Sequence, residues 1–130
     1  MCRLRSIAAN VVAGLIGVFL APTVFAADDL GAAREMAISH CSQCHTFGKD
    51  EPHGQGPNLF GLIGREAGVA FGYQFSEGFR EALKGKIWDA VLLDRWLTDT
   101  LTVAPRGGMV YFQDDAKKRA ALTRFFESLR

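Results

Sequence analysis

Cys41, Cys44 and His45 form the pattern C-x-x-C-H, which is the clearest chemical signal in this 130-residue chain. This pattern is the attachment signature of c-type haem. Residues three and four apart share one face of a helical turn, so both thiols can reach the same flat group. Each thiol can add to a haem vinyl group as a thioether, while the imidazole binds the iron. The run therefore predicts one covalently bound haem c.

Paired cysteines also occur in disulfides, zinc sites and thioredoxin-like redox centres. A zinc site needs further ligands at paired spacing, and no second cysteine pair follows in the chain. A thioredoxin-like pair lies between a strand and a helix, a pattern that is not found here. The histidine directly after the second cysteine favours haem attachment over a disulfide.

A second iron ligand is expected, because haem iron in electron-transfer proteins commonly takes Met opposite His. Met109 follows a proline and two glycines, a loop that can bring a side chain against a flat ring. Met36 lies on the expected first helix and is interpreted as a core residue. His40 and His53 are the rival ligands, and both are interpreted as surface or loop-bonding residues. Met109 is therefore the predicted second ligand.

The N-terminus has the layout of a secretory signal peptide. Arg3 and Arg5 precede an apolar run over 7–21, and Val24-Phe25-Ala26 supplies a cleavage site. Cleavage after Ala26 divides the chain into a signal peptide, 1–26, and one domain, 27–130. The apolar run is short for a membrane span, although an uncleaved anchor is an alternative. We expect a periplasmic or otherwise exported protein whose mature chain does not span the membrane.

Size and charge narrow the function further. The chain has 15 Lys and Arg against 14 Asp and Glu, and the expected cleavage removes two arginines, which leaves a net charge of about −1. Without a basic stripe, nucleic-acid binding is not expected. About a hundred mature residues make one domain with a limited core. A bound haem would complete that core, so we expect the haem-free chain to be largely unfolded.

Helical periodicity dominates the chain after residue 27, and no strand-like alternation of useful length is found. Asp28 or Asp29 is the expected cap of the first helix. The third helix is expected to bury an apolar stripe of Val91, Leu92, Trp96 and Leu97. The predicted class is all-α, with four to five helices wrapped around one covalent haem. The expected helices cover 30–41, 76–83, 88–98 and 114–129, and the expected loops cover 47–72 and 100–112.

With these motifs in order, the chain from about 29 to 129 resembles the class I cytochrome c family, especially its bacterial secreted, single-haem members. The resemblance rests on segments in the same order and with similar gaps. They are Cys41-Ser42-Gln43-Cys44-His45, Gly56-Pro57-Asn58-Leu59-Phe60-Gly61-Leu62-Ile63-Gly64-Arg65, Trp88, Trp96-Leu97, Pro105 to Met109, and the aromatic final helix.

The resemblance implies roles for further residues. The carbonyl of Pro57 would accept a hydrogen bond from the axial imidazole, which fixes its tautomer. Arg65 would lie near a haem propionate, and the indole N–H of Trp88 would bond one. His53 would tie two loops together by a bond to backbone.

Two aromatic positions depart from the family pattern. Phe75 stands where a tyrosine often bonds a propionate, and Tyr73 is the nearby candidate to replace it. Trp96 stands where many members have a tyrosine that reaches the Met sulfur, and its indole N–H is the candidate substitute. Tyr73 and Trp96 complete the predicted cofactor-binding set.

The resemblance implies a one-electron carrier between periplasmic or membrane-bound redox proteins, not an enzyme. We expect a monomer that meets its redox partners transiently. Two alternatives remain open. One is a haem subunit of a larger oxidoreductase complex. The other is a ligand-binding sensor or peroxidase-like protein in which Met109 is labile.

Overall fold

The structure, a computed structural model, describes residues 25–130. The expected signal peptide lies outside the described residues except for its last two positions, which belong to the first helix. Within 25–130 the chain forms helices and no named strands, which confirms the all-α class. The helices are α1 (Phe25–Cys41), α2 (Glu77–Ala82), α3 (Ala90–Thr98), α4 (Thr100–Val103) and α5 (Ala116–Ser128). None of them is both long and apolar enough to cross a bilayer.

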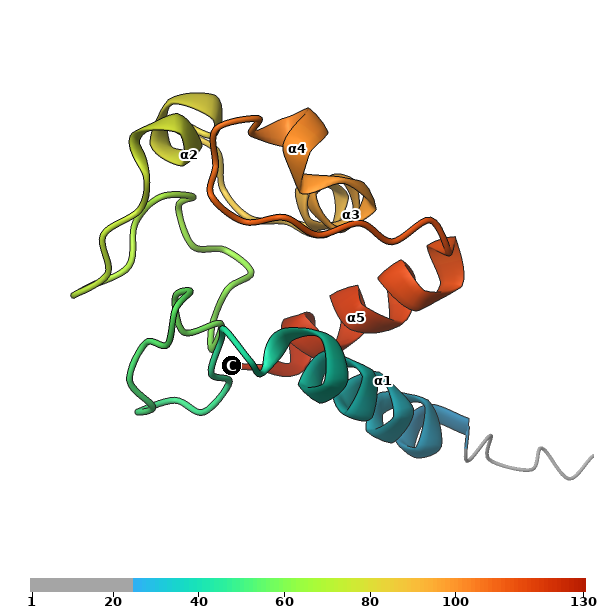
Figure 1. Ribbon diagram of the computed structural model, residues 1–130. Helices are drawn as coiled ribbons and strands as arrows, with labels where there is room; N and C mark the ends of the chain where they lie inside the picture. The colour runs from blue at the N-terminus through green and yellow to red at the C-terminus, as the bar shows by residue number, and fades with distance from the viewer. Residues whose placement is uncertain (1–24) are drawn as a thin grey trace, which may run out of the picture.

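The most extensive helix contact joins α1 and α5, which cross in the lower part of Figure 1. Ala33 and Ala37 are 1% and 0% exposed, so small side chains let the two helices approach closely. Phe125 and Phe126 of α5 belong to the same buried core. The C-terminal end is fixed as well, because the backbone N–H of Gly61 donates to the carbonyl of Leu129 over 2.8 Å.

The third helix shows one wrong prediction at Val91. Asp89 caps α3 by accepting from the backbone N–H of Leu92 at 2.7 Å. The row at i, i+3 and i+4 that faces the core is Leu93, Trp96 and Leu97. Val91 is 70% exposed because it begins the opposite row, which continues through polar residues.

Two helix boundaries differ from expectation. α1 is not capped by Asp28 or Asp29 but continues back to Phe25, since the alanine-rich segment there favours helix. The expected loop over 100–112 begins instead with the short helix α4. Asp99 starts α4 by accepting from the backbone N–H of Leu101 at 2.9 Å.

Between α4 and α5 runs an irregular segment, residues 104–115, that we call the Met109 strap. Figure 1 shows it in orange to red, crossing from α4 to the start of α5. Asp115 caps α5, accepting from the backbone N–H groups of Lys117 and Lys118. These bonds hold the pKa of the Asp115 carboxyl below its usual range.

Candidate functional site

One cavity of about 770 Å³ lies between the end of α1, the loop that follows, the helices α2 and α3, and the Met109 strap. A cavity of this size is in the usual range for a cofactor or small-molecule site. All nine predicted cofactor-binding residues line it: Cys41, Cys44, His45, Pro57, Arg65, Tyr73, Trp88, Trp96 and Met109. The fold therefore brings residues from five separate parts of the chain to one place.

The end of α1 presents the two thiols to this cavity. The backbone N–H groups of Cys44 and His45 donate to the carbonyl of Cys41 at 3.1 and 2.9 Å, so the helical turn continues past the last helical residue. Cys41 and Cys44 are separate thiols and form no disulfide with each other. Burial, and then the neighbouring Cys44, raise the pKa of the Cys41 thiol to about 11. The Cys44 thiol donates to the amide oxygen of Gln55 over 3.2 Å.

The imidazole of His45 has a defined tautomer. Its Nδ1 lies 2.7 Å from the carbonyl oxygen of Pro57. A carbonyl oxygen only accepts, so Nδ1 carries the proton and Nε2 keeps its lone pair. Burial lowers the pKa of this imidazole, and the bond to Pro57 opposes that shift only in part. The ring is thereby held neutral, as a metal-binding histidine must be.

A network of loop bonds holds Pro57 in place. The backbone N–H of Asn58 donates to Nδ1 of His53 at 2.9 Å, and Nε2 of the same ring donates to the carbonyl of Phe71 at 2.8 Å. The Asn58 side chain, in a residue only 7% exposed, donates to Thr46 and to the carbonyls of Gly48 and Glu51. His53 therefore ties two loops together, as the resemblance implied.

Three hydrogen-bond donors on the cavity wall, the guanidinium of Arg65 and the indoles of Trp88 and Trp96, have no carboxylate partner in the described part of the protein. Arg65 donates to the carbonyl of Asn58 at 3.0 Å, and burial lowers the pKa of its guanidinium. Among the side chains of residues 29–130, no carboxylate lies within ion-pair distance of it. In the same part of the chain, the indole N–H groups of Trp88 and Trp96 make no hydrogen bond to protein. They are not sealed in the core, since the buried side-chain polar atom that lacks a partner there is Oγ1 of Thr123. Such donors fit a ligand that carries carboxylates.

The aromatic side chains at the positions that depart from the family pattern, Tyr73, Phe75 and Trp96, also border the cavity. The Tyr73 hydroxyl donates to the carbonyl of Gln55 at 2.8 Å, so its proton is already engaged. Its ring packs edge-on against Phe75, with centroids 4.8 Å apart. Trp96 packs edge-on against Phe79 and Trp88, at centroid distances of 5.3 and 5.8 Å.

Met109 is half-buried on the strap, and its backbone is held by Thr100. The Thr100 hydroxyl donates to the carbonyl of Met109 at 2.9 Å and accepts from the N–H of Tyr111 at 2.9 Å. The Tyr111 hydroxyl in turn lies 2.9 Å from Nδ1 of His40. His40 is thus an exposed, side-chain-bonded residue, and Met36 packs against the core, as expected.

Sequence reasoning missed several residues that shape the site. Gly56 lies so close to His45 that a Cβ there would be 2.3 Å from the ring carbon Cε1. Its position before Pro57 was the signal that could have identified it. Thr100 and Tyr111 gave no signal, because their bonds depend on how the strap folds back.

The residues present fit a haem c. The cavity offers two thiols, a neutral imidazole, a thioether sulfur and unpaired donors, within largely apolar and aromatic walls. Soft sulfur and imidazole are the iron ligands of electron-transfer haems. The donors Arg65 and Trp88 match the propionates.

Comparisons with known proteins give one consistent set of relatives. The chain is 35% identical over 83 residues to cytochrome c of Ginkgo biloba, covering 64% of this chain and 72% of that protein. It is 42% identical over 60 residues to cytochrome c-550 of Novispirillum itersonii, covering 45% and 54%. It is 36% identical over 74 residues to cytochrome c2 of Pararhodospirillum photometricum, covering 56% and 66%. No protein-family model matches the chain.

Proposed function

Because this chain belongs to the class I cytochrome c family, we propose that it is a periplasmic one-electron carrier, not an enzyme, with its iron held between His45 and Met109. As a member of the family it carries one covalently bound haem c and is a single-haem electron carrier. The observation that carries the finer proposal is the cavity onto which the paired thiols, the neutral imidazole and the thioether all open.

The bound haem supplies a one-electron couple at its iron. Cys41 and Cys44 would hold it through thioethers. The lone pair on Nε2 of His45 is free for the iron because Nδ1 donates to Pro57. Met109 contributes a neutral sulfur from a half-buried strap. A neutral ligand and an apolar wall disfavour the additional charge of the ferric state, so these residues raise the reduction potential.

The remaining predicted residues would hold the edges of the haem. Arg65 and Trp88 offer donors that suit propionate carboxylates. Tyr73 contributes its ring to the wall, since its hydroxyl proton is engaged by Gln55. We assign Trp96 to the Met109 side on the family resemblance. Both residues line a second, small cavity of about 40 Å³, which His45 and Trp88 line as well.

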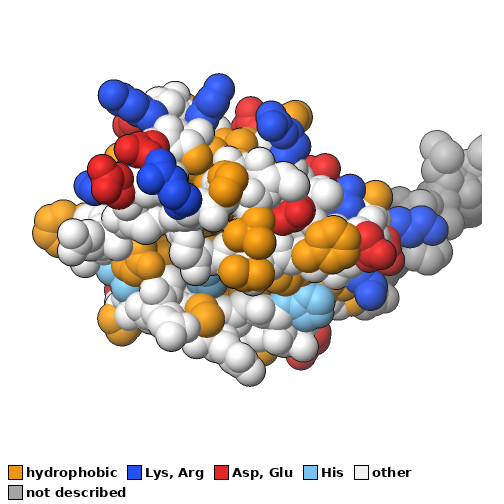
Figure 2. All heavy atoms as spheres, turned by 45° about the horizontal axis from the view of Figure 1, so that its top comes forward, with side chains coloured by type: hydrophobic (Ala, Val, Ile, Leu, Met, Phe, Trp, Pro, Cys, Tyr) orange, Lys and Arg blue, Asp and Glu red, His pale blue; other side chains and the backbone are white. Residues whose placement is uncertain are grey.

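The surface at the cavity mouth suits brief encounters with redox partners. Val69 and Val110 line the cavity and are 54% and 77% exposed. Figure 2 shows hydrophobic side chains gathered across the middle of the face that it draws, while charged side chains lie mainly along its upper edge. Redox partners typically share small interfaces that separate quickly. We propose that the mature chain works as an exported monomer that meets its donor and acceptor in turn.

Replacing Met109 by Ala tests the proposal in the haem-loaded protein. A redox titration followed by visible spectroscopy should show a lower reduction potential and loss of the weak far-red sulfur–iron absorption. The reduced variant should also bind CO rapidly, because the sulfur no longer fills the sixth position. Met36→Leu is the matched control, since Met36 packs in the core on α1, and its spectrum should stay that of the wild type.

An unchanged spectrum in Met109→Ala would mean that another side chain binds the iron. Rapid CO binding by the reduced wild-type protein would instead favour the ligand-binding alternative.

A further inference from the structure

The backbone from Met109 to Tyr111 is held by one buried hydroxyl. Thr100 is 0% exposed and lies at the start of α4, nine residues before Met109. We propose that Thr100 is a positioning residue for Met109: its hydroxyl fixes the path of the strap so that the thioether faces the cavity. The inference rests on the proposed ligation of iron by Met109.

The hydrogen bonds lie on either side of Val110, the residue directly after Met109. The Thr100 hydroxyl donates to the Met109 carbonyl at 2.9 Å, with a longer contact of 3.3 Å to the Tyr111 carbonyl. The same oxygen accepts from the Tyr111 N–H at 2.9 Å. The backbone N–H of Thr100 donates to the Tyr111 carbonyl at 3.1 Å. One residue therefore engages the backbone groups directly before and after Val110.

This bracketing decides which side chains turn inward. Met109 and Tyr111 are half-buried, whereas Val110 between them is 77% exposed. An extended segment alternates its side chains between two faces, so a slip by one residue would turn Met109 outward. The bonds from Thr100 hold that register. A bridge between Asp99 and Phe112, next along both segments, continues the pairing.

A second bond fastens the strap on its other side. The Tyr111 hydroxyl lies 2.9 Å from Nδ1 of His40 near the end of α1. The strap is thus bonded to α4 through its backbone, by Thr100, and to α1 through the Tyr111 side chain, by His40. Within residues 25–130, Thr100 is the only residue that hydrogen-bonds the backbone of Met109, so the effect on the sulfur should follow the Thr100 hydroxyl.

The role needs the hydroxyl rather than the volume of the side chain. Valine has nearly the same shape as threonine but can neither donate to Met109 nor accept from Tyr111. Both backbone groups would then lose their partner in a buried setting. Serine keeps the hydroxyl and should keep both bonds.

The test compares Thr100→Val and Thr100→Ser in the haem-loaded protein. Imidazole added to the ferric protein should bind to the Val variant roughly tenfold faster or more. Loss of a buried hydrogen bond typically changes such a rate by about this factor. The Ser variant should bind it at the wild-type rate. Hydrogen exchange at the Tyr111 amide should accelerate in the Val variant by a similar factor and stay slow in the Ser variant.

Thr102→Val is the matched control. Thr102 belongs to the same short helix, but its exposed hydroxyl donates to the carbonyl of Asp99 and does not contact the strap. This variant should show wild-type imidazole binding and wild-type exchange at Tyr111. If Thr100→Val gives no holoprotein, the pair Thr100→Ala and Thr100→Ser isolates the hydroxyl in the same way.

The outcomes separate this inference from the proposed function. If Met109→Ala opens the iron while Thr100→Val binds imidazole at the wild-type rate and Tyr111 exchanges slowly, the role of Thr100 is overturned. If Met109→Ala leaves the spectrum unchanged, the proposed ligation fails, although exchange at Tyr111 still reports whether Thr100 holds the strap. A Ser variant as perturbed as the Val variant also counts against the role.

Discussion

At the scale of single residues, the position of the His45 ring depends on the lack of a side chain at Gly56. The imidazole lies against the backbone of Gly56, where a Cβ would be 2.3 Å from Cε1 and 2.7 Å from Nδ1. No real Cβ contact is that short, so either the ring or the loop would have to move. The bond from Nδ1 to Pro57 depends on the same approach.

Gly56→Ala should therefore displace the imidazole and break its bond to Pro57. We expect a lower yield of holoprotein, and in what matures a shift from a low-spin toward a high-spin visible spectrum. Gly31→Ala is the control, because nothing lies within 4 Å of a Cβ there and the site is inside α1. That change should raise the free energy of unfolding by about 0.5–1 kcal/mol. A wild-type spectrum and potential in Gly56→Ala would contradict the steric argument.

The candidate ligands could be chosen from the sequence, and the structure places them around one cavity, but several of the residues that support them could not. Residue type and spacing indicate Cys41, Cys44 and His45, and the surrounding loop indicates Met109. Thr100 and Gly56 act through contacts that exist only after the chain has folded, and threonine and glycine are common enough to carry no signal by themselves. The resemblance supplied Pro57, whose carbonyl lies where it implied.

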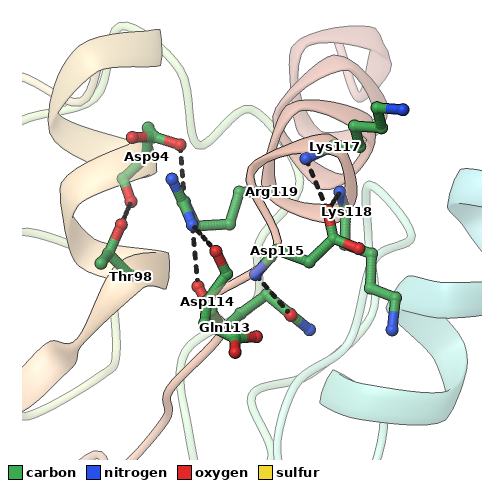
Figure 3. A network of polar contacts seen from close by, with 8 residues as sticks. All are labelled: Asp94, Thr98, Gln113, Asp114, Asp115, Lys117, Lys118 and Arg119. Carbon is green, nitrogen blue, oxygen red and sulfur yellow. Dashed lines mark hydrogen bonds and ion pairs between the residues drawn. The ribbon is translucent and has the colours of Figure 1, made fainter.

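At the scale of elements, Arg119 joins α3, α5 and the end of the Met109 strap (Figure 3). Its side chain is 13% exposed. Nε donates to Asp94 on α3 at 2.8 Å, and Nη1 donates to the carbonyls of Gln113 and Asp114 at 3.0 and 2.9 Å. One guanidinium thereby satisfies strap carbonyls that lie close to the start of α5.

Replacing Arg119 by Ala should lower the free energy of unfolding by about 2 kcal/mol, since hydrogen bonds to a charged group in a nearly buried place are lost. Urea titration of the haem-loaded protein measures this. Arg124→Ala is the control: its pair with Asp29 also joins two helices, but both side chains are about half exposed, at 51% and 56%. Exposed pairs contribute roughly 0–1 kcal/mol. Equal losses in both variants would show that Arg119 acts as an ordinary surface residue.

The elements themselves were predictable where a cap and an apolar row agree. α2, α3 and α5 fall within two residues of their expected bounds, because Ser76, Asp89 and Asp115 cap them and buried rows follow. α4 was missed because the proline and glycines after it made the whole segment look like loop. Its four residues are too few for periodicity, and only the Asp99 cap marks its start.

At the scale of the whole molecule, the cavity opens beside one continuous core, to which Phe79 of α2, Trp96 of α3 and Phe126 of α5 belong. α1 packs on α5, and α3 packs on α5 and α4, but α2 has no comparable contact with another helix. It is joined to the strap instead: the Ser76 hydroxyl donates to the carbonyl of Gly107 at 3.0 Å, and Glu81 pairs with Arg106. A haem bound in the cavity of about 770 Å³ would therefore connect α2 and the strap with the rest of this core.

Because a haem in this cavity would complete the core, we expect the haem-free mature chain, proposed as residues 27–130, to be largely unfolded. Circular dichroism should then lack the helical signal of the holoprotein.

Alkylation of the cysteines at pH 8 gives a second, local readout. In the folded arrangement burial raises the pKa of Cys41 to about 11, whereas the usual value is 9.0. The thiolate fraction there would be about a hundredfold below that of an ordinary thiol, and reaction would slow accordingly. An unfolded chain removes that burial, so Cys41 and Cys44 should react at similar rates, each assigned with the Cys41→Ser and Cys44→Ser variants. A native-like helical spectrum together with a protected Cys41 would show that the polypeptide closes its own core, and that the haem adds chemistry without supplying the fold.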